Sequence, residues 1–298
     1  MSGRIVARLT GFAATVALVI GAAWWVGTLT GPPGDPVPSV AADRHAGEQA
    51  GGTPFPIESA GLVSTAAGYT LVPRASTTFE PGVPGELAFV VIGSDGLPVT
   101  AFDVKDERML DLVVVRRDGA GYQHPRADLG PDGVWRAPLT LAAAGVYRVY
   151  ADFVPTGGPP LVLGIDLQVP GDFAPATFPP SRAAHVAGYD VRLDADLVAG
   201  GTSRVFVTID HGRVPVTDIE PHLGALGHLV VLRESDLAYL RVAPQAPEPD
   251  AAATHRAGPG PAFTVEVPAA GEHRLFLEFR HGGVVHTAEF TVRTGSDQ

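Results

Sequence analysis

Histidines near two short apolar runs are the residues of this sequence whose types and positions could do chemistry. His228 directly precedes the run LVVL, and His124 precedes Pro125 a few residues after the similar run LVVV. Neighbouring strands bring the start of one strand within several ångströms of the end of its partner, so imidazoles at these places can share one ion. His222 supplies a third imidazole nearby in the sequence. His228, His222 and His124 are therefore the candidate metal ligands.

A metal site of reasonable affinity needs three or four ligands, so further donors are required near these histidines. The Met109 thioether and the carboxylates of Asp111 and Glu220 are the nearest other donors in the sequence. The alternative interpretation is that the histidines are scattered over the surface and the cores and hold no ion. His273 and His281 have such explanations, as a corner residue and as the tip of a His-Gly-Gly hairpin turn.

Catalytic motifs with a known mechanism do not occur in this sequence. Lys105 does not follow a glycine-rich phosphate loop, and there is no His-Glu-x-x-His and no Gly-x-Ser-x-Gly. Cysteine is absent, which excludes disulfides, thiolate metal ligands and a cysteine nucleophile. The net charge of −11, with Lys105 as the only lysine, argues against nucleic-acid binding. The sequence therefore predicts no enzyme and no catalytic residue.

An internal repeat gives these residues their places in the chain. Residues 188–292 match residues 68–169 block by block, and each copy has the length of one small all-β domain. The matching blocks are GYTL with GYDV, GLPVTAF with RVPVTDI, DLVVVRRDGAGYQHP with HLVVLRESDLAYLRVAP, and AAGVYRVYADF with AAGEHRLFLEF. Residues that recur at equivalent places are expected to serve turns and strands of the shared fold. They are Asp118 with Asp236 and Tyr122 with Tyr239.

Short runs rich in β-branched and aromatic residues, separated by Gly, Pro or Asp, predict about seven strands in each copy. The expected fold is all-β, with two tandem immunoglobulin-like β-sandwich domains after an N-terminal transmembrane helix. A cupredoxin-like strand order fits the same pattern. Domain 1 is expected at residues 68–170, a Pro-rich linker at residues 171–187, and domain 2 at residues 188–294. Trp135 is an expected core residue, and Tyr147 is the expected corner tyrosine of the penultimate strand.

The N-terminal segment predicts a membrane anchor at residues 1–31. Arg4 and Arg8 precede an uncharged stretch at residues 9–34 that is long enough to cross a bilayer. These arginines predict a single-pass plasma-membrane protein with a cytoplasmic N-terminus and extracytoplasmic domains. A cleaved signal peptide and a secreted protein are the alternative. Residues 32–67, rich in Pro, Gly and Ala, are expected to form a flexible stalk.

The chain resembles a family of uncharacterised bacterial envelope proteins that carry a membrane anchor and tandem sandwich domains. The resemblance rests on the anchor, the stalk and the ordered blocks GYTL, PVT and HLVVLRESDLAYL. Family members often have a His before the LVVxR strand and a His-x-His-Pro on the next strand, which suggests copper or another soft metal. In domain 2 this chain keeps His228 but has Arg241 and Ala243 at the later places. In domain 1 it has Asp111 at the leading place and keeps His124.

The resemblance and the missing motifs imply a membrane-anchored, extracytoplasmic, non-catalytic binding or scaffold protein of the bacterial envelope. The expected partners are the membrane, through the N-terminal helix, and another envelope protein, and no nucleic acid. No cofactor is expected under this interpretation. The alternative is a metal-handling module that binds copper through a partly degenerate site of His228, His222 and His124.

Overall fold

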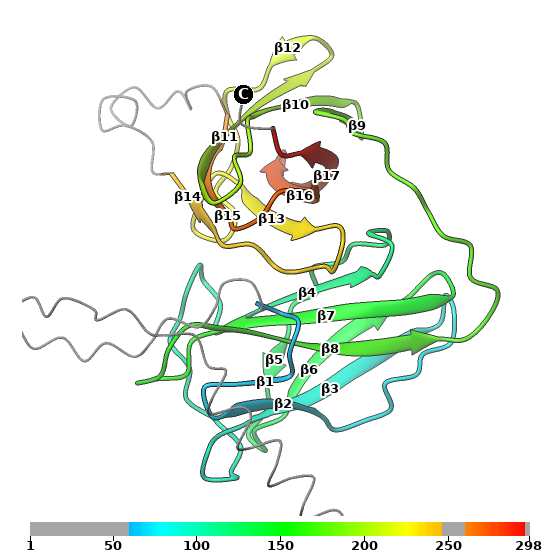
Figure 1. The fold of residues 1–298 in the computed structure, drawn as a ribbon, viewed down its shortest axis with the longest axis vertical. Helices are drawn as coiled ribbons and strands as arrows, with labels where there is room; N and C mark the ends of the chain where they lie inside the picture. The colour runs from blue at the N-terminus through cyan, green and yellow to red at the C-terminus, as the bar shows by residue number, and fades with distance from the viewer. Residues whose placement is uncertain (1–59, 246–259, 296–298) are drawn as a thin grey trace, which may run out of the picture. The chain divides into compact units, whose positions relative to one another are not determined.

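The computed structural model describes residues 60–245 and 260–295, and the regular secondary structure in these ranges is β-strand throughout (Figure 1). No helix in the described ranges has the length and apolar character needed to cross a bilayer. The expected anchor, residues 1–31, and most of the expected stalk, residues 32–67, lie outside these ranges. The described chain forms two β-sandwiches, each built from two antiparallel sheets.

The first sandwich is formed by residues before the linker. Its strands are β1 (Thr65–Ala66), β2 (Tyr69–Pro73), β3 (Pro84–Ile92), β4 (Leu110–Arg116), β5 (Asp128–Leu129), β6 (Trp135–Thr140), β7 (Gly145–Phe153) and β8 (Leu161–Val169). One sheet has the order β1-β2-β3-β6-β5, and the other has the order β4-β7-β8.

The second sandwich repeats this arrangement. Its strands are β9 (Ala183–Val186), β10 (Tyr189–Ala195), β11 (Gly201–His211), β12 (Val214–Pro215), β13 (His228–Arg233), β14 (Val242–Pro244), β15 (Ala262–Val267), β16 (Glu272–His281) and β17 (Val284–Arg293). The larger sheet has the order β14-β15-β11-β10-β9, with β12 paired to β11, and the smaller sheet has the order β13-β16-β17.

Both sandwiches have the strand order of immunoglobulin constant domains, in which strands A, B, E and D form one sheet and C, F and G form the other. In the first sandwich the two sets are β2-β3-β6-β5 and β4-β7-β8, and in the second they are β10-β11-β15-β14 and β13-β16-β17. The predicted all-β, immunoglobulin-like fold is therefore confirmed for the described residues. The strand order also decides between the immunoglobulin-like and cupredoxin-like alternatives.

Each sandwich encloses a core between its two sheets. Trp135 is buried in the first core, with Phe102 packed edge-on at 5.2 Å between ring centroids. The Tyr147 hydroxyl donates a hydrogen bond of 2.9 Å to the Ala143 carbonyl, which confirms the corner tyrosine. His273, its counterpart in the second sandwich, is fully buried, and burial lowers its imidazole pKa. The interpretation of His273 as a structural corner residue fits this environment.

Two segments outside the expected domain ranges take part in the sandwiches. Strand β1 falls in the range expected for the stalk and pairs with β2. Strand β9 falls in the range expected for the linker and pairs with β10. The Ser181 amide also donates a hydrogen bond of 2.8 Å to the Thr291 carbonyl. The second sandwich therefore begins before residue 188, and the connection between the sandwiches is shorter than the repeat alone indicates.

A third apolar cluster lies between the two sandwiches. It is formed by the outward-facing side chains of the two smaller sheets and by residues beside them. Its members are Val113, Val115, Tyr150, Val230, Leu232, Leu237, Tyr239 and Phe276. Strands β4 and β13 are consequently covered on both faces, whereas β10 alternates strictly between buried and exposed residues. This double burial explains why LVVV and LVVL are continuous apolar runs.

The contacts of this cluster are reciprocal between the sandwiches. The strand registers pair Val113 with Tyr150 and Val230 with Phe276, which makes Tyr150 and Phe276 equivalent residues. Tyr122 of the first sandwich stacks on Phe276 of the second, with ring centroids 4.3 Å apart. Tyr239 of the second sandwich packs on Tyr150 of the first at 5.3 Å. We call the contact between the two sandwiches, formed by this cluster and the residues beside it, the joint. The joint has the pattern of an isologous interface within one chain.

The recurrent residues noted in the sequence separate into two groups. Asp118 accepts a hydrogen bond of 3.2 Å from the Ala120 amide, and Asp236 accepts the same kind of bond at 3.1 Å from Ala238. These two aspartates are turn residues, as expected. Tyr122 and Tyr239 instead lie in the joint, so reading them only as strand residues of each separate fold missed their shared role.

Replacing Val230 with aspartate will separate the sandwiches, because Val230 is fully buried in the joint and an unpaired buried carboxylate costs several kcal/mol. We expect a larger radius of gyration by small-angle X-ray scattering, with the far-ultraviolet circular dichroism of β-sheet retained. Thr140→Asp, on an exposed position of β6, is the matched control and leaves the radius unchanged. An unchanged radius in Val230→Asp contradicts the assignment of this cluster as the joint.

Candidate functional site

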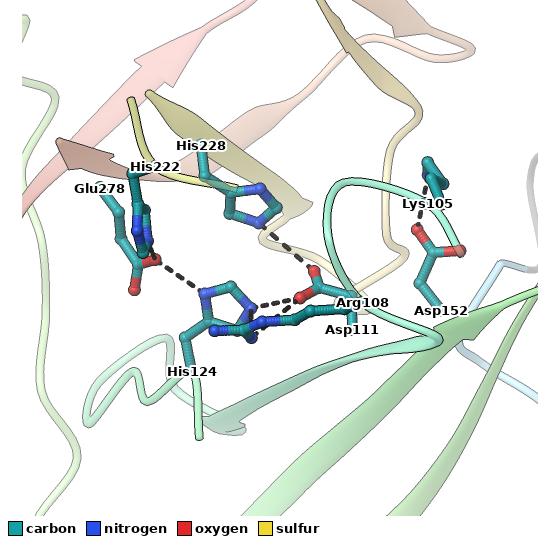
Figure 2. A network of polar contacts seen from close by, with 8 residues as sticks. All are labelled: Lys105, Arg108, Asp111, His124, Asp152, His222, His228 and Glu278. Atoms are coloured by element: carbon teal, nitrogen blue, oxygen red, sulfur yellow. Dashed lines mark hydrogen bonds and ion pairs between the residues drawn. The ribbon is translucent and has the colours of Figure 1, made fainter. Parts of the chain in front are cut away.

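A network of charged side chains lies between the two sandwiches, beside the apolar cluster (Figure 2). Asp111 is the second residue of β4, and His228 is the first residue of β13. Glu278 lies on β16 and pairs with His228 in the strand register. His124 follows Gln123, whose amide and carbonyl pair with those of Val114 on β4. The small sheets of both sandwiches thus direct polar groups to one place.

Two tight turns at equivalent places in the repeat supply the remaining residues. In the turn 105–108, Lys105 and Arg108 exchange both backbone hydrogen bonds, at 2.8 and 2.9 Å. In the turn 222–225, His222 and Ala225 do the same, at 2.7 and 3.3 Å. The central residues of both turns have positive φ, which is the conformation of type I′ turns. The turns therefore bring Lys105, Arg108 and His222 to the joint.

His124 is the centre of the network, because its two ring nitrogens contact carboxylates of both sandwiches. Nδ1 lies 2.7 Å from Oε2 of Glu278, which belongs to the second sandwich. Nε2 contacts Oδ1 of Asp111 on β4 of its own sandwich. The side chain of His124 is 2% exposed, so water does not compete for these contacts. The imidazole therefore bridges the two sandwiches by charge-assisted hydrogen bonds.

The other two candidate histidines flank His124. The His228 ring stacks on the His124 ring with centroids 4.8 Å apart and an interplanar angle of 21°. His228 Nε2 lies 3.4 Å from Asp111 Oδ2, and within the described ranges this buried nitrogen has no hydrogen-bond partner. His222 Nε2 lies 3.4 Å from Glu278 Oε2. The structure thus brings together all three histidines that the sequence proposed as metal ligands.

Arg108 adds a second positive charge beside His124. Its Nη1 lies 3.3 Å from Asp111 Oδ1 and 2.9 Å from His124 Nε2. When His124 carries protons on both nitrogens, the guanidinium and the imidazolium share the Asp111 carboxylate. Lys105 forms a separate ion pair of 3.2 Å with Asp152. The joint therefore contains cations and carboxylates in close alternation.

The protonation states follow from this arrangement. Burial lowers the pKa of His124, but hydrogen bonds with Asp111 and Glu278 outweigh burial and raise it to about 9. Burial raises the pKa of Glu278, and its contacts with His124 and His222 reverse this effect and lower the pKa to about 2. For the same reason the Asp111 pKa lies well below its ordinary value, despite burial. His124 is consequently protonated at neutral pH, and both carboxylates are charged.

The repeat places equivalent residues on the two sides of the network. Asp111 and His228 occupy equivalent register positions and face one another across the joint. Their strand partners, Asp152 and Glu278, are also equivalent. Each of these carboxylates meets a residue from the tight turn of its own sandwich, Lys105 for Asp152 and His222 for Glu278. The two halves thus place different side chains at equivalent strand and turn positions.

Three of these residues have the composition and spacing of a metal site. Among the described residues, Asp111, His124 and His228 form the one group of three donors whose ligand atoms all lie within 4.8 Å of one another. His222 lies outside this group, on the Glu278 side.

The further donors expected near the histidines lie in different places. Asp111 belongs to the group of three. Met109 is 39% exposed, and Glu220 forms an ion pair of 3.0 Å with Arg280. Sequence reasoning missed Glu278, which is 154 residues away from the His124 that it contacts.

In comparison with known proteins, the second sandwich matches a family model that assigns no activity. Residues 184–296 match a family described as a domain of unknown function (DUF8832). No curated protein matches the chain.

Solved structures with similar folds are distant. A Salmonella alpha-2-macroglobulin reacted with methylamine aligns over 78% of this chain at 16% identity, with a TM-score of 0.27, and the chain spans only 15% of that protein. The N-terminal Ig1-2 module of the Drosophila receptor protein tyrosine phosphatase DLAR aligns over 76% of this chain and 99% of its own length, at 10% identity and a TM-score of 0.21. Domains 5-6 of the S-layer protein SbsC align over 76% and 98%, at 11% identity and a TM-score of 0.23. The fold assignment therefore rests on the strand order.

Raising the pH from about 6 to about 10 will weaken the joint. The pKa of His124 rises from 6.5 to about 9 on folding, so its stabilisation is complete below the unfolded value and is lost as the pH passes the folded value. The loss amounts to about 3 kcal/mol at most, since a tenfold change in proton affinity is worth about 1.4 kcal/mol. Urea unfolding across this range measures the effect.

The matched variants for this experiment are His124→Gln and His185→Gln, the second on an exposed histidine of β9. His124→Gln removes the titrating group and should flatten the alkaline loss of stability, whereas His185→Gln should retain it. Equal pH dependence in the wild type and in His124→Gln contradicts the central role of His124.

Proposed function

We propose that this protein is a membrane-anchored, extracytoplasmic, non-catalytic binding or scaffold protein of the bacterial envelope. The observation that carries the proposal is the joint, in which both smaller sheets bury their outer faces against one another. This packing leaves the two larger sheets and their loops free to meet a partner. The N-terminal anchor at residues 1–31 is part of the proposal and rests on the uncharged stretch after Arg4 and Arg8.

The polar residues of the described chain support a non-catalytic role. The charged groups of the joint are held by one another, and the side chain of His124 is almost completely covered. Two surface grooves of about 240 and 210 Å³ lie on the first sandwich. Glu80 and Glu86 are the only titratable side chains among their lining residues, and neither groove includes a histidine. These grooves provide no pairing of a nucleophile with a base.

A photo-reactive amino acid at Phe206 will test the scaffold role in intact cells, because this side chain is 43% exposed on the larger sheet of the second sandwich. We expect the full chain to sediment with membranes, to be degraded by protease added outside the inner membrane, and to cross-link to a discrete envelope protein. Val230→Asp should lower the cross-linking yield several-fold, and Thr140→Asp should not. Cytoplasmic domains, or the absence of any discrete cross-link, would contradict the proposal.

A second candidate function is the binding of a divalent metal ion by Asp111, His124 and His228. The specific support is the close spacing of their donor atoms together with the buried Nε2 of His228, which makes no hydrogen bond within the described ranges. Glu278 contacts Nδ1 of His124, and such a contact would fix this imidazole with Nε2 directed at an ion, as carboxylates do beside many metal-bound histidines. Two imidazoles and one carboxylate suit Zn(II) or Cu(II). A bound ion would tie the two sandwiches together through its ligands.

Calorimetric titration of the full chain in detergent with Zn(II) and Cu(II) will test this second function. We expect stoichiometric binding that His228→Ala and His124→Ala each weaken at least tenfold, because each removes one of three ligands. His185→Ala, an exposed histidine outside the joint, is the control and should bind like the wild type. Binding that is equally strong in all four proteins would place the ion elsewhere and contradict the assignment.

A further inference from the structure

Arg108 places a guanidinium among the donors of the candidate metal site. Its Nη1 lies 2.9 Å from His124 Nε2 and 3.3 Å from Asp111 Oδ1, so it occupies the space beside two of the three proposed ligands. A metal ion bound to Asp111 and His124 would lie where the guanidinium now lies and would repel its positive charge. The guanidinium and the ion therefore exclude one another.

We propose that Arg108 is an internal competitor of a divalent metal ion, filling the site when the ion is absent and leaving it when the ion binds. The inference rests on the second candidate function and adds a means of regulating it. In this arrangement the chain supplies its own cation, so the joint stays closed without metal. The metal affinity then depends on two free energies: the gain from binding the ion and the cost of displacing Arg108.

The charges of the site fit the exchange of Arg108 for a divalent ion. The site holds the two carboxylates of Asp111 and Glu278, and the Arg108 guanidinium lies 3.3 Å from the first of them. A divalent ion in the place of the guanidinium carries two positive charges, which match these two carboxylates. A monovalent ion leaves one carboxylate charge unbalanced, so Zn(II) or Cu(II) is favoured over Cu(I).

The backbone that carries Arg108 is suited to movement. Arg108 ends the turn 105–108, in which the exposed residues Asp106 and Glu107 have φ of 50° and 64°. A left-handed conformation costs a residue with a side chain on the order of 1 kcal/mol. A rearrangement that withdraws Arg108 can recover part of this free energy. The opposing turn 222–225 has a glycine, Gly224, at one of its two left-handed positions and is less strained.

Arg108→Gln tests the competition directly, because it removes the charge and keeps a polar side chain. With the full chain in detergent and stripped of metal by a chelator, we expect Zn(II) to bind Arg108→Gln at least tenfold more tightly than the wild type. We also expect Zn(II) to raise the melting temperature of this variant more than that of the wild type. Arg108→Met, which keeps the aliphatic stem of arginine, is measured in parallel in case Gln impairs folding.

Two control variants locate the effect. Arg126→Gln removes an exposed arginine of the same sandwich that pairs with Asp128 at 3.1 Å, and it should bind Zn(II) like the wild type. The double variant Arg108→Gln, His228→Ala should not show the tighter Zn(II) binding expected of Arg108→Gln alone. Zn(II) binding of equal affinity in wild type, Arg108→Gln and Arg108→Met, lost in each on His228→Ala, overturns the role of Arg108 and leaves the metal function standing. No binding in wild type or in either Arg108 variant overturns both.

Discussion

The constraint on which this structure depends is that the two smaller sheets bury both of their faces. Burial of Val113, Val115, Val230 and Leu232 against the opposite sandwich removes apolar surface from water, which stabilises the joint at roughly 25 cal/mol per Å². The same contact withdraws charged residues at the strand ends from water. A buried charge is costly unless it is paired, so each of these groups must find an opposite charge within the joint. The polar network is thus a consequence of the apolar contact.

Much of the fold could be predicted from the sequence because strand alternation and turn residues are local signals. Strand β10 alternates strictly, and its length and face follow from that pattern alone. The repeat further predicts that both copies have the same strand order. The joint was not predicted, although the uninterrupted runs LVVV and LVVL signal strands that are covered on both sides. A strand with one buried face alternates between apolar and polar residues, and these runs do not. The missing alternation was the sequence signal for a second covered face.

The site could be predicted only in part, for a related reason. His124, His222 and His228 are recognisable because imidazole is a common metal ligand and the strands place them near one another. Glu278 gave no signal, since it lies on a different strand and its role depends on how two domains meet. Arg108 depends on the conformation of a turn, which the residues between Lys105 and Arg108 do not specify, because neither is glycine.

The two copies of the repeat differ in charge where they meet. Asp111 and His228 occupy equivalent positions in the two copies and face one another across the joint, with His228 Nε2 3.4 Å from Asp111 Oδ2. Identical residues at this place would set two carboxylates or two imidazolium groups against one another, which is destabilising in a buried environment. Divergence to opposite charges removes the repulsion. The tight turns, which bear no such conflict, have kept the same pair of backbone hydrogen bonds, and each sandwich places a tyrosine against an aromatic ring of the other.

Because two nearly equivalent surfaces form the joint, the same contact can also form between two molecules. The surface that each sandwich offers to its neighbour in the chain can be met by the same surface of another chain, and the short connection after β8 favours closure within the molecule by its high effective concentration. Shortening of that connection until it no longer spans the two sandwiches removes this advantage. The sandwiches of two chains can then exchange partners with every contact of the joint preserved, which gives a domain-swapped dimer.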